Sequence, residues 1–347
     1  MNVPRRTIQV VGPLALVAGA ALVGSLFSRE TEIYFINALI GVVVVVALYV
    51  FVGNSGVLSF GHISFVAVGA WAAGVLSVPV EEKSAIFPSL YPLIGDNTVG
   101  NVTSLLVASA VGGVYAFLVG LPLMRLSGLT AGIATFAVLE ITHNVLRYWD
   151  RIGPGTNSFS SVPETTDLLQ AALGAAIAVG VAFAYQTGRL GRQLRAIRED
   201  SAAARAVGIP VVRQRLWAFA LSGALAGLAG GLYVHFLPVS TEDFYLNLTF
   251  ITLAMLVIGG AGSLWGAVVG ALAVSGLDSF LAEAEGGMTL AGQTLDLPSG
   301  ARLIVVGFLM ALVLVLRPTG LTGGQEFSLP RSRRPPERPA TAGSVSP

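Results

Sequence analysis

Cysteine is missing from this sequence, and charge is scarce. Only three histidines occur in 347 residues, and charged residues make up 11% of the chain. The absence of thiols excludes a disulfide-stabilised secreted fold and a thiolate metal site. No two histidines stand at metal-ligand spacing beside a second carboxylate, so we expect no metal site. A net charge of +1, with no basic block before the last residues, excludes nucleic acid as a partner.

Apolar residues and glycine are abundant instead. Hydrophobic residues make up 54% of the chain, and 42 residues are glycine. A soluble domain carries about 25% charged residues, more than twice the share found here. The apolar runs are long and continuous rather than short and alternating, which favours helices over a β-barrel. The sequence therefore predicts an all-α polytopic membrane protein.

We expect about ten transmembrane helices. A spanning helix needs about 20 mostly apolar residues. Ten stretches come close to this length, at residues 8–27, 33–52, 57–78, 101–124, 127–146, 168–187, 215–236, 246–260, 263–281 and 301–317. Only the turn Gly259-Gly260-Ala261-Gly262 separates the eighth from the ninth, so one of these two is a candidate for a short or re-entrant piece.

The distribution of lysine and arginine predicts the orientation. With the N-terminus inside, the inner segments hold 15 of the 20 basic residues and the outer segments hold 5. Thirteen carboxylates then lie outside and four inside, with Glu140 and Asp278 within spans. Seven arginines fall in one inner loop, from Arg189 to Arg215. We therefore expect a multi-pass protein of the cytoplasmic membrane with both termini in the cytoplasm.

The two ends of the chain need separate interpretation. Arg5-Arg6 before an apolar run also fits a cleaved signal peptide, including a twin-arginine signal, although the rest of that pattern is absent. From Gln325 onward the chain is rich in Pro, Arg and Ser. This composition predicts a disordered cytoplasmic tail at residues 325–347. The transmembrane domain would then comprise residues 1–324.

Two glycine-rich segments join neighbouring spans. Residues 53–62 connect the second span to the third, and residues 259–266 connect the eighth to the ninth. Both begin with the pattern G-x-x-G-x-L. Tight packing of helices through small residues explains most glycines in such a protein. At these two places we expect broken or re-entrant helices, which are tolerated where they face protein or a water-filled path.

The longest polar inner loop comprises residues 188–210. Apolar side chains recur there at helical spacing, at Leu190, Leu194, Ile197, Ala204 and Val207. Arg192, Arg195 and Glu199 lie on another face, and Gly208 and Pro210 end the pattern. The loop therefore predicts a short amphipathic helix parallel to the membrane. Either it rests on anionic membrane lipid as a topological anchor, or it docks in a groove of a cytoplasmic partner.

Polar residues at membrane depth are candidates for a transport path. The candidates are Asn54, Ser55, Ser59, His62, Thr130, Thr135 and Glu140. Glu140 and His143 stand one helical turn apart, so they are able to pair. The alternative for these groups is a satisfied contact between helices.

The chain resembles a known family. Four stretches carry the resemblance: 53–70; 126–140 with 153–163; 191–208 with 218–230; and 257–270 with 317–321. In these stretches, which cover most of residues 33–321, the sequence is similar to the permease subunits of ABC importers for branched-chain amino acids, of the LivM type. Ala203, Ala204 and Gly208 match the Glu-Ala-Ala-x-x-x-Gly pattern of such permeases, with Ala202 in place of the glutamate.

The resemblance implies the ABC importer permease fold and a set of partners. These are a second homologous permease subunit, two cytoplasmic ATPase subunits and an extracytoplasmic substrate-binding protein. Residues 188–210 would form the cytoplasmic coupling loop, which sits in a cleft of the ATPase. The expected ATPase-coupling residues are Arg192, Arg195, Arg198, Glu199, Ala203, Ala204, Arg205 and Gly208.

The expected function is inward movement of branched-chain amino acids or related small solutes. The chain has no G-x-x-x-x-G-K-[ST] phosphate loop, so separate ATPase subunits must drive transport, and we expect neither an enzyme nor a cofactor. One alternative is a similar permease for urea, short amides or a sugar. Another is an ion-coupled secondary transporter that uses Glu140 and Asp278. A third alternative is an intramembrane hydrolase that uses Glu140, His143 or His62, although no known hydrolase motif supports it.

Overall fold

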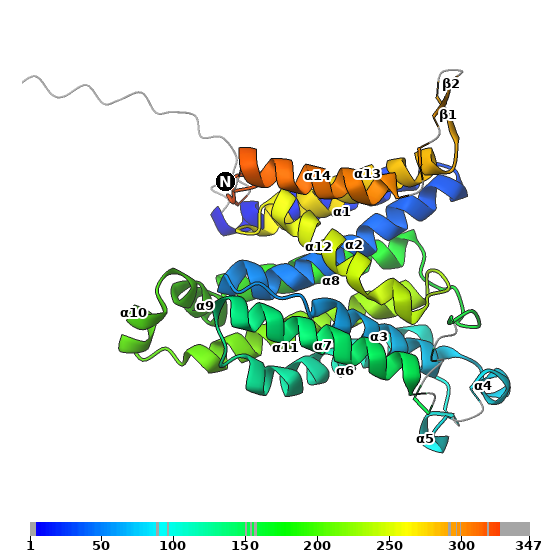
Figure 1. The fold of residues 1–347 in the computed structure, drawn as a ribbon, viewed down its shortest axis with the longest axis horizontal. Helices are drawn as coiled ribbons and strands as arrows, with labels where there is room; N and C mark the ends of the chain where they lie inside the picture. The colour runs from blue at the N-terminus through cyan, green and yellow to red at the C-terminus, as the bar shows by residue number, and fades with distance from the viewer. Residues whose placement is uncertain are drawn as a thin grey trace, which may run out of the picture.

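The structure, a computed structural model, is helical almost throughout (Figure 1). It describes residues 5–326 apart from 88, 89, 96, 150, 153, 154, 156, 157, 291, 292, 296, 299 and 318. The tail predicted at residues 325–347 therefore lies outside the described residues, except for Gln325 and Glu326. A polytopic, helical membrane protein is confirmed. The hairpin of β1 (Met288–Leu290) and β2 (Gln293–Leu295) is an addition that hydropathy does not predict.

Each of the ten apolar stretches coincides with one helix. These are α1 (Arg5–Gly24), α2 (Arg29–Ser55), α3 (His62–Ser77), α6 (Asn101–Leu123), α7 (Gly128–Tyr148), α8 (Leu168–Thr187), α11 (Val211–Val234), α12 (Leu246–Gly259), α13 (Leu264–Glu285) and α14 (Ala301–Leu316). Six of the described helices are long and apolar enough to cross a membrane: α2, α6, α7, α8, α11 and α13. The apolar parts of α1, α3, α12 and α14 are shorter.

The short elements lie at the two ends of the bundle (Figure 1). One end carries α9 (Arg189–Glu199) and α10 (Ser201–Ala206), and the first described residues lie at this end too. The opposite end carries α4 (Val80–Ile86), α5 (Pro92–Gly95) and the hairpin. The 3₁₀ turn η1 (Thr241–Phe244) connects α11 to α12.

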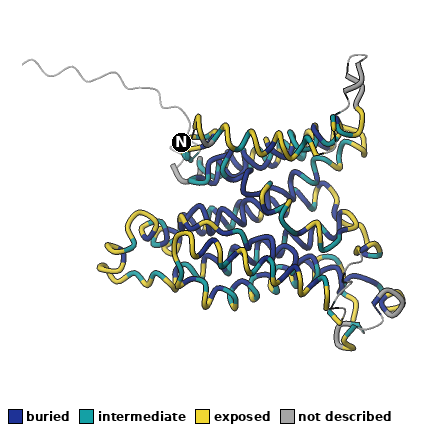
Figure 2. The backbone as a smooth tube through the Cα atoms, viewed as in Figure 1, coloured by how far each residue is buried: buried dark blue, intermediate teal, exposed yellow. Residues whose placement is uncertain are grey.

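Helix α2 forms the centre of the bundle. Every residue from Ala38 to Ser55 is buried, and α8, α11 and α13 pack around the helix. Its run of five valines, Val42–Val46, is apolar on all sides, as a helix surrounded by other helices requires. Figure 2 shows the buried residues concentrated in the inner helices and exposed residues on the outer ones. The exposed side chains on the outer helices include large apolar ones such as Ile304 and Val315 of α14, as expected of a lipid-facing surface.

Small residues set the spacing between α11 and its neighbours. A Cβ atom on Gly230 would lie 2.0 Å from the carbonyl oxygen of Val66 on α3. On the side of α11 facing α6, a Cβ on Gly227 would lie 2.3 Å from the carbonyl oxygen of Ala108. The backbones of α3, α6 and α11 therefore approach one another as closely as the small-residue pattern in the sequence predicts.

Both glycine-rich segments interrupt the helices. Helix α2 ends at Ser55, the next residue Gly56 has a left-handed φ of 69°, and α3 begins only at His62. Helix α12 ends at Gly260, with φ 116°, and α13 begins at Leu264. The segment after α14 covers the second break, because the amide of Leu321 donates to the carbonyl of Ile258 at 2.8 Å. These breaks place backbone groups beside α9, where the candidate site lies.

Candidate functional site

Residues 188–210 form two helices rather than one. Asp200 separates α9 from α10 with extended backbone angles (φ −150°, ψ 107°). Its carboxylate accepts hydrogen bonds from the amides of Ala202 and Ala203, at 2.8 and 3.0 Å, and so caps α10. The apolar stripe is accordingly divided: Leu194 and Ile197 are buried, whereas Val207 is 76% exposed. A single helical stripe was the wrong expectation, because an Asp cap starts a new helix in its middle.

The charge of Asp200 is part of this cap. The amide of Ala203, and after it that of Ala202, holds the pKa of the carboxyl below its ordinary value of 3.8. The contribution to stability is therefore present above that value and is lost as the pH falls through the lowered pKa. We expect Asp200→Ala to increase amide hydrogen exchange in residues 201–206, whereas Asp200→Asn retains the cap. Unchanged exchange in Asp200→Ala would contradict the role of this side chain.

Arg195 fastens α9 to the interior of the bundle. Its Nε donates to Oδ1 of Asn54 at 2.8 Å, and one terminal nitrogen donates to Oε1 of Gln186 at 2.8 Å and to the hydroxyl of Tyr49 at 3.0 Å. The Tyr49 hydroxyl itself donates to Gln186 at 2.6 Å. One guanidinium group thus joins α9 to the end of α2 and to the end of α8.

Two further contacts complete this network. Arg198 donates to the carbonyl of Gly53 at 2.5 Å, inside the last turn of α2. Glu326 lies 3.8 Å from Arg195 and accepts hydrogen bonds from the amides of Leu264 and Trp265, at 3.2 and 3.5 Å. A carboxylate at a helix N-terminus is favourable, because the first amides of the helix lack acceptors. Glu326 was assigned to the tail in the sequence, where nothing distinguishes it from Glu337.

The predicted ATPase-coupling residues therefore divide into two groups. Arg195, Arg198 and the buried Ala204 are engaged within this chain. The others are exposed at the end of the bundle and have no hydrogen bond to α2 among the described residues: Arg192, which donates to the carbonyl of Thr187 at 3.0 Å, and Glu199, Ala203, Arg205 and Gly208. Spacing on a helix identifies a polar face but not the partners of that face, so the sequence does not separate the two groups.

The predicted path residues near the first helix break are buried and bonded. Oδ1 of Asn54 accepts a hydrogen bond from Nε of Arg195, and the Oγ of Ser55 accepts one from the amide of Val57 at 3.1 Å. Ser59 lies 2.8 Å from Nδ1 of His62. The other ring nitrogen of His62 has no hydrogen-bond partner among the described residues, because Phe51, Phe65 and Phe219 surround the ring.

Thr130, Thr135 and Glu140 lie along α7 in different surroundings. Thr130 is exposed at the start of the helix. Thr135 is buried and accepts from the amide of Phe60 at 3.1 Å, which joins α7 to the first break. Glu140 is partly exposed and accepts from the hydroxyl of Tyr245 and, at 2.8 Å, from Nδ2 of Asn144.

A polar cluster surrounds Glu140 on the half of α7 away from α9. His143 does not bond to Glu140; its ring stacks on Tyr245 with centroids 4.0 Å apart, and its Nε2 lies 3.7 Å from Glu242. Arg147 also forms an ion pair with Glu242. The sequence does not predict Tyr245 or Glu242 as members, since they lie about 100 residues from α7 in the chain.

Comparison with known proteins identifies the family. A model of the branched-chain amino acid transport system permease component matches residues 31–314, most of the chain. The chain belongs to this family. The permease is 26% identical to the high-affinity branched-chain amino acid transport system permease protein LivM of Salmonella typhimurium and to that of Escherichia coli. Each alignment spans 343 residues and covers 89% of this chain and 73% of the relative.

More distant relatives carry other names. The autoinducer 2 import system permease protein LsrC of an Enterobacter species is 30% identical over 191 residues, which are 51% of this permease and 55% of LsrC. No solved structure matches the chain. The family match runs from the start of α2 to within α14. It therefore includes both helix breaks, the α9–α10 segment and the polar cluster of α7.

Proposed function

We propose that this permease is the membrane-spanning subunit of an ABC importer that moves branched-chain amino acids, or related small solutes, inward across the cytoplasmic membrane. The family match over residues 31–314 carries this proposal. Two LivM relatives that align with 89% of the chain support the choice of solute. The LsrC relative supports the wider range of small solutes. The permease has no catalytic role in this scheme, because the ATPase subunits hydrolyse the nucleotide.

In this proposal all ten helices lie in the membrane and both termini face the cytoplasm. The arginines of α9, α10 and the start of α11 gather at one end of the bundle, as the positive-inside rule requires of the cytoplasmic end. The first described residues lie at this end as well (Figure 1). Helices α3 and α12 are shorter than about 20 residues, and their breaks reach the level of α9.

The α9–α10 segment couples transport to the ATPase subunits. Arg192 and Glu199 form the exposed contact surface. Arg195 and Arg198 transmit the movement, because they bond to the end of α2 next to the first helix break. A displacement of α9 is thereby passed to α2 and, through Glu326, to α13. The spans then alternate between outward-facing and inward-facing states.

The transport path runs along α7 and a second homologous permease subunit completes it. Several large apolar side chains of α7 are exposed, Ile133, Phe136 and Ile141 among them, so this helix is uncovered in the single chain. Glu140 on the same helix supplies a polar group at membrane depth. At the outer end, an extracytoplasmic substrate-binding protein delivers the solute.

Uptake into vesicles tests the function. The vesicles contain the permease, its partner permease and the ATPase subunits. We expect them to accumulate radiolabelled leucine only when ATP is present on the cytoplasmic side and the binding protein is present on the outer side. Uptake by the permease alone under an ion gradient would overturn the proposal in favour of a secondary transporter. Competition with isoleucine, urea and ribose distinguishes the solute classes.

A charge reversal tests the contact surface. We expect Arg192→Glu to reduce co-purification of the ATPase subunits about fivefold or more. A positive charge at an interface faces negative charge on the partner, so the glutamate would be repelled there. Arg317→Glu, which changes an exposed arginine at the end of α14, is the matched control. Equal co-purification of the two variants would remove Arg192 from the interface.

A further inference from the structure

A hollow of about 670 Å³ opens beside α10 at the end of the bundle that we assign to the cytoplasm. The link between α6 and α7, helix α10 and the first turns of α11 line it. Its polar lining consists of Ser127, Ser201, Arg125, Arg205, Arg213 and Arg215. No carboxylate is among the described residues that line this hollow. The wall itself therefore holds four positive charges and no negative one, and the nearby carboxylate of Asp200 interacts with one of the four, Arg205.

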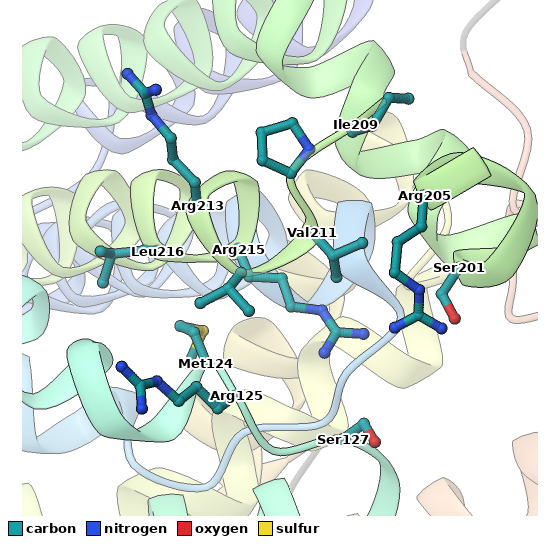
Figure 3. A pocket seen from close by; sticks show the side chains of 12 residues that line it. Met124, Arg125, Ser127, Ser201, Arg205, Ile209, Val211, Arg213, Arg215 and Leu216 are labelled. Atoms are coloured by element: carbon teal, nitrogen blue, oxygen red, sulfur yellow. The ribbon is translucent and has the colours of Figure 1, made fainter. Parts of the chain in front are cut away.

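Two of the arginines converge. Figure 3 shows the guanidinium groups of Arg205 and Arg215 directed toward the same space, whereas those of Arg125 and Arg213 point away from it. The charges of Arg205 and Arg215 repel one another. One terminal nitrogen of Arg215 donates to the carbonyl of Leu126 at 3.1 Å, and its buried Nε has no partner in the described part of the chain.

The rest of the lining is apolar and continues onto the lipid-facing surface. Met124, Val211 and Leu216 belong to this part of the wall, together with Ile209, Pro210 and Val212. Leu121 of α6 and Leu129 of α7, which flank the link, are 46% and 79% exposed. An occupant with an anionic head and an apolar tail would meet donors in the hollow and hydrocarbon-compatible surface beside it. The volume lies within the range of ligand pockets, about 300–1,000 Å³.

We propose that this hollow binds the phosphate of an anionic phospholipid of the cytoplasmic leaflet, held by the guanidinium groups of Arg205 and Arg215. Guanidinium groups match phosphate oxygens as forked donors, and a phosphate between them removes their mutual repulsion. The hydroxyls of Ser127 and Ser201 lie on the same hollow and supply further donors. The proposal uses the sidedness of the proposed function but not the identity of the solute.

A consequence concerns α10. Arg205 is on α10, and Arg215 is on α11, so one bound phosphate fixes the short helix to the start of a long one. An anionic lipid would then hold the α9–α10 segment in place before any ATPase subunit arrives. Basic pockets on the cytoplasmic side of helical membrane proteins bind lipid head groups in this manner.

Native mass spectrometry of the purified permease, without ATPase subunits, tests this directly. The probes are phosphatidylglycerol, phosphatidylethanolamine and inorganic phosphate. We expect phosphatidylglycerol to be retained about tenfold more strongly than phosphatidylethanolamine, and Arg205→Gln with Arg215→Gln to remove that preference. Arg317→Gln changes another cytoplasmic-end arginine outside the hollow and should keep the preference.

Three results would overturn the proposal. The first is equal retention of phosphatidylglycerol by the double variant and by Arg317→Gln. The second is displacement of the lipid by millimolar inorganic phosphate, which would assign the hollow to a soluble phosphate ester. The third is loss of ATPase binding in the double variant with lipid retention unchanged, which would assign the arginines to the protein partner. If the double variant aggregates, the lipid preference of Arg215→Gln alone is compared with that of the unmodified permease. An equal preference for phosphatidylglycerol in the two proteins, or no preference in the unmodified permease, would then overturn the proposal.

Discussion

Replacing Arg195 by alanine will leave ATP hydrolysis by the assembled transporter largely intact and reduce leucine uptake about tenfold. The substitution removes the donor that Asn54, Gln186 and Tyr49 share, and it leaves the carboxylate of Glu326 without its nearest cation. Helix α9 then loses its fastening to α2 and α8, so movement of the ATPase subunits is no longer passed to the spans. Because the Arg195 side chain is 38% exposed, we expect the permease to lose only about 2 kcal/mol of stability.

Arg189→Ala is the matched control, since Arg189 is an exposed arginine on the same helix. The ratio of leucine taken up to ATP hydrolysed, in vesicles of equal protein content, is the measurement. Arg195→Lys should give an intermediate ratio, because one ammonium group replaces the charge but not the forked geometry. Equal ratios for Arg195→Ala and Arg189→Ala would show that α9 does not transmit force through this network.

Gly230→Ala will destabilise the permease and lower its melting temperature. A Cβ atom there would lie 2.0 Å from the carbonyl oxygen of Val66 and 2.6 Å from the amide nitrogen of Ala70. Both are backbone atoms, so no side-chain rotation relieves the clash, and α3 and α11 must separate. Overpacking of a closely packed site costs about 1–3 kcal/mol, and a backbone contact lies at the upper end. We expect a lower yield of monodisperse protein and a clear fall in melting temperature.

Gly180→Ala provides the comparison. Gly180 is on α8, and a Cβ atom there meets nothing within 4 Å. Alanine favours a helix over glycine by up to about 1 kcal/mol, so this variant should be neutral or slightly more stable. Thermal unfolding of the two variants in the same detergent makes the comparison. Equal melting temperatures would contradict the close approach of α3 and α11.

The helices were predictable because each forms a long apolar run, and six of those described are long and apolar enough to cross a membrane. Each of the ten stretches coincides with a helix whose ends lie within a few residues of the expected ones. The helix ends at the two glycine-rich segments were predictable for a similar reason. Glycine adopts a positive φ without steric cost, and Gly56 and Gly260 both have one. Hydropathy does not predict the β1–β2 hairpin, because its six residues are too few for a pattern.

The site was predictable by residue type but not by partner. Spacing placed Arg192 and Arg195 on one face of α9, yet only the second turns inward, toward Asn54. That difference depends on the position of α2, which is about 140 residues away in the chain. Tyr245 was not predicted for the same reason, because its link to Glu140 joins α7 to the residue between η1 and α12, about 100 residues further along the chain.

The network at Arg195 also imposes an order on biosynthesis. Tyr49 and Glu326 lie 277 residues apart, and their side chains meet at the same guanidinium group. A ribosome has released all ten of the apolar helices before Glu326 emerges. Helix α9 therefore remains incompletely secured until the segment that carries Glu326 leaves the ribosome and links α9 to α13. In any chain that terminates before Glu326, α9 would lack its link to α13 and would be exposed to membrane quality-control proteases.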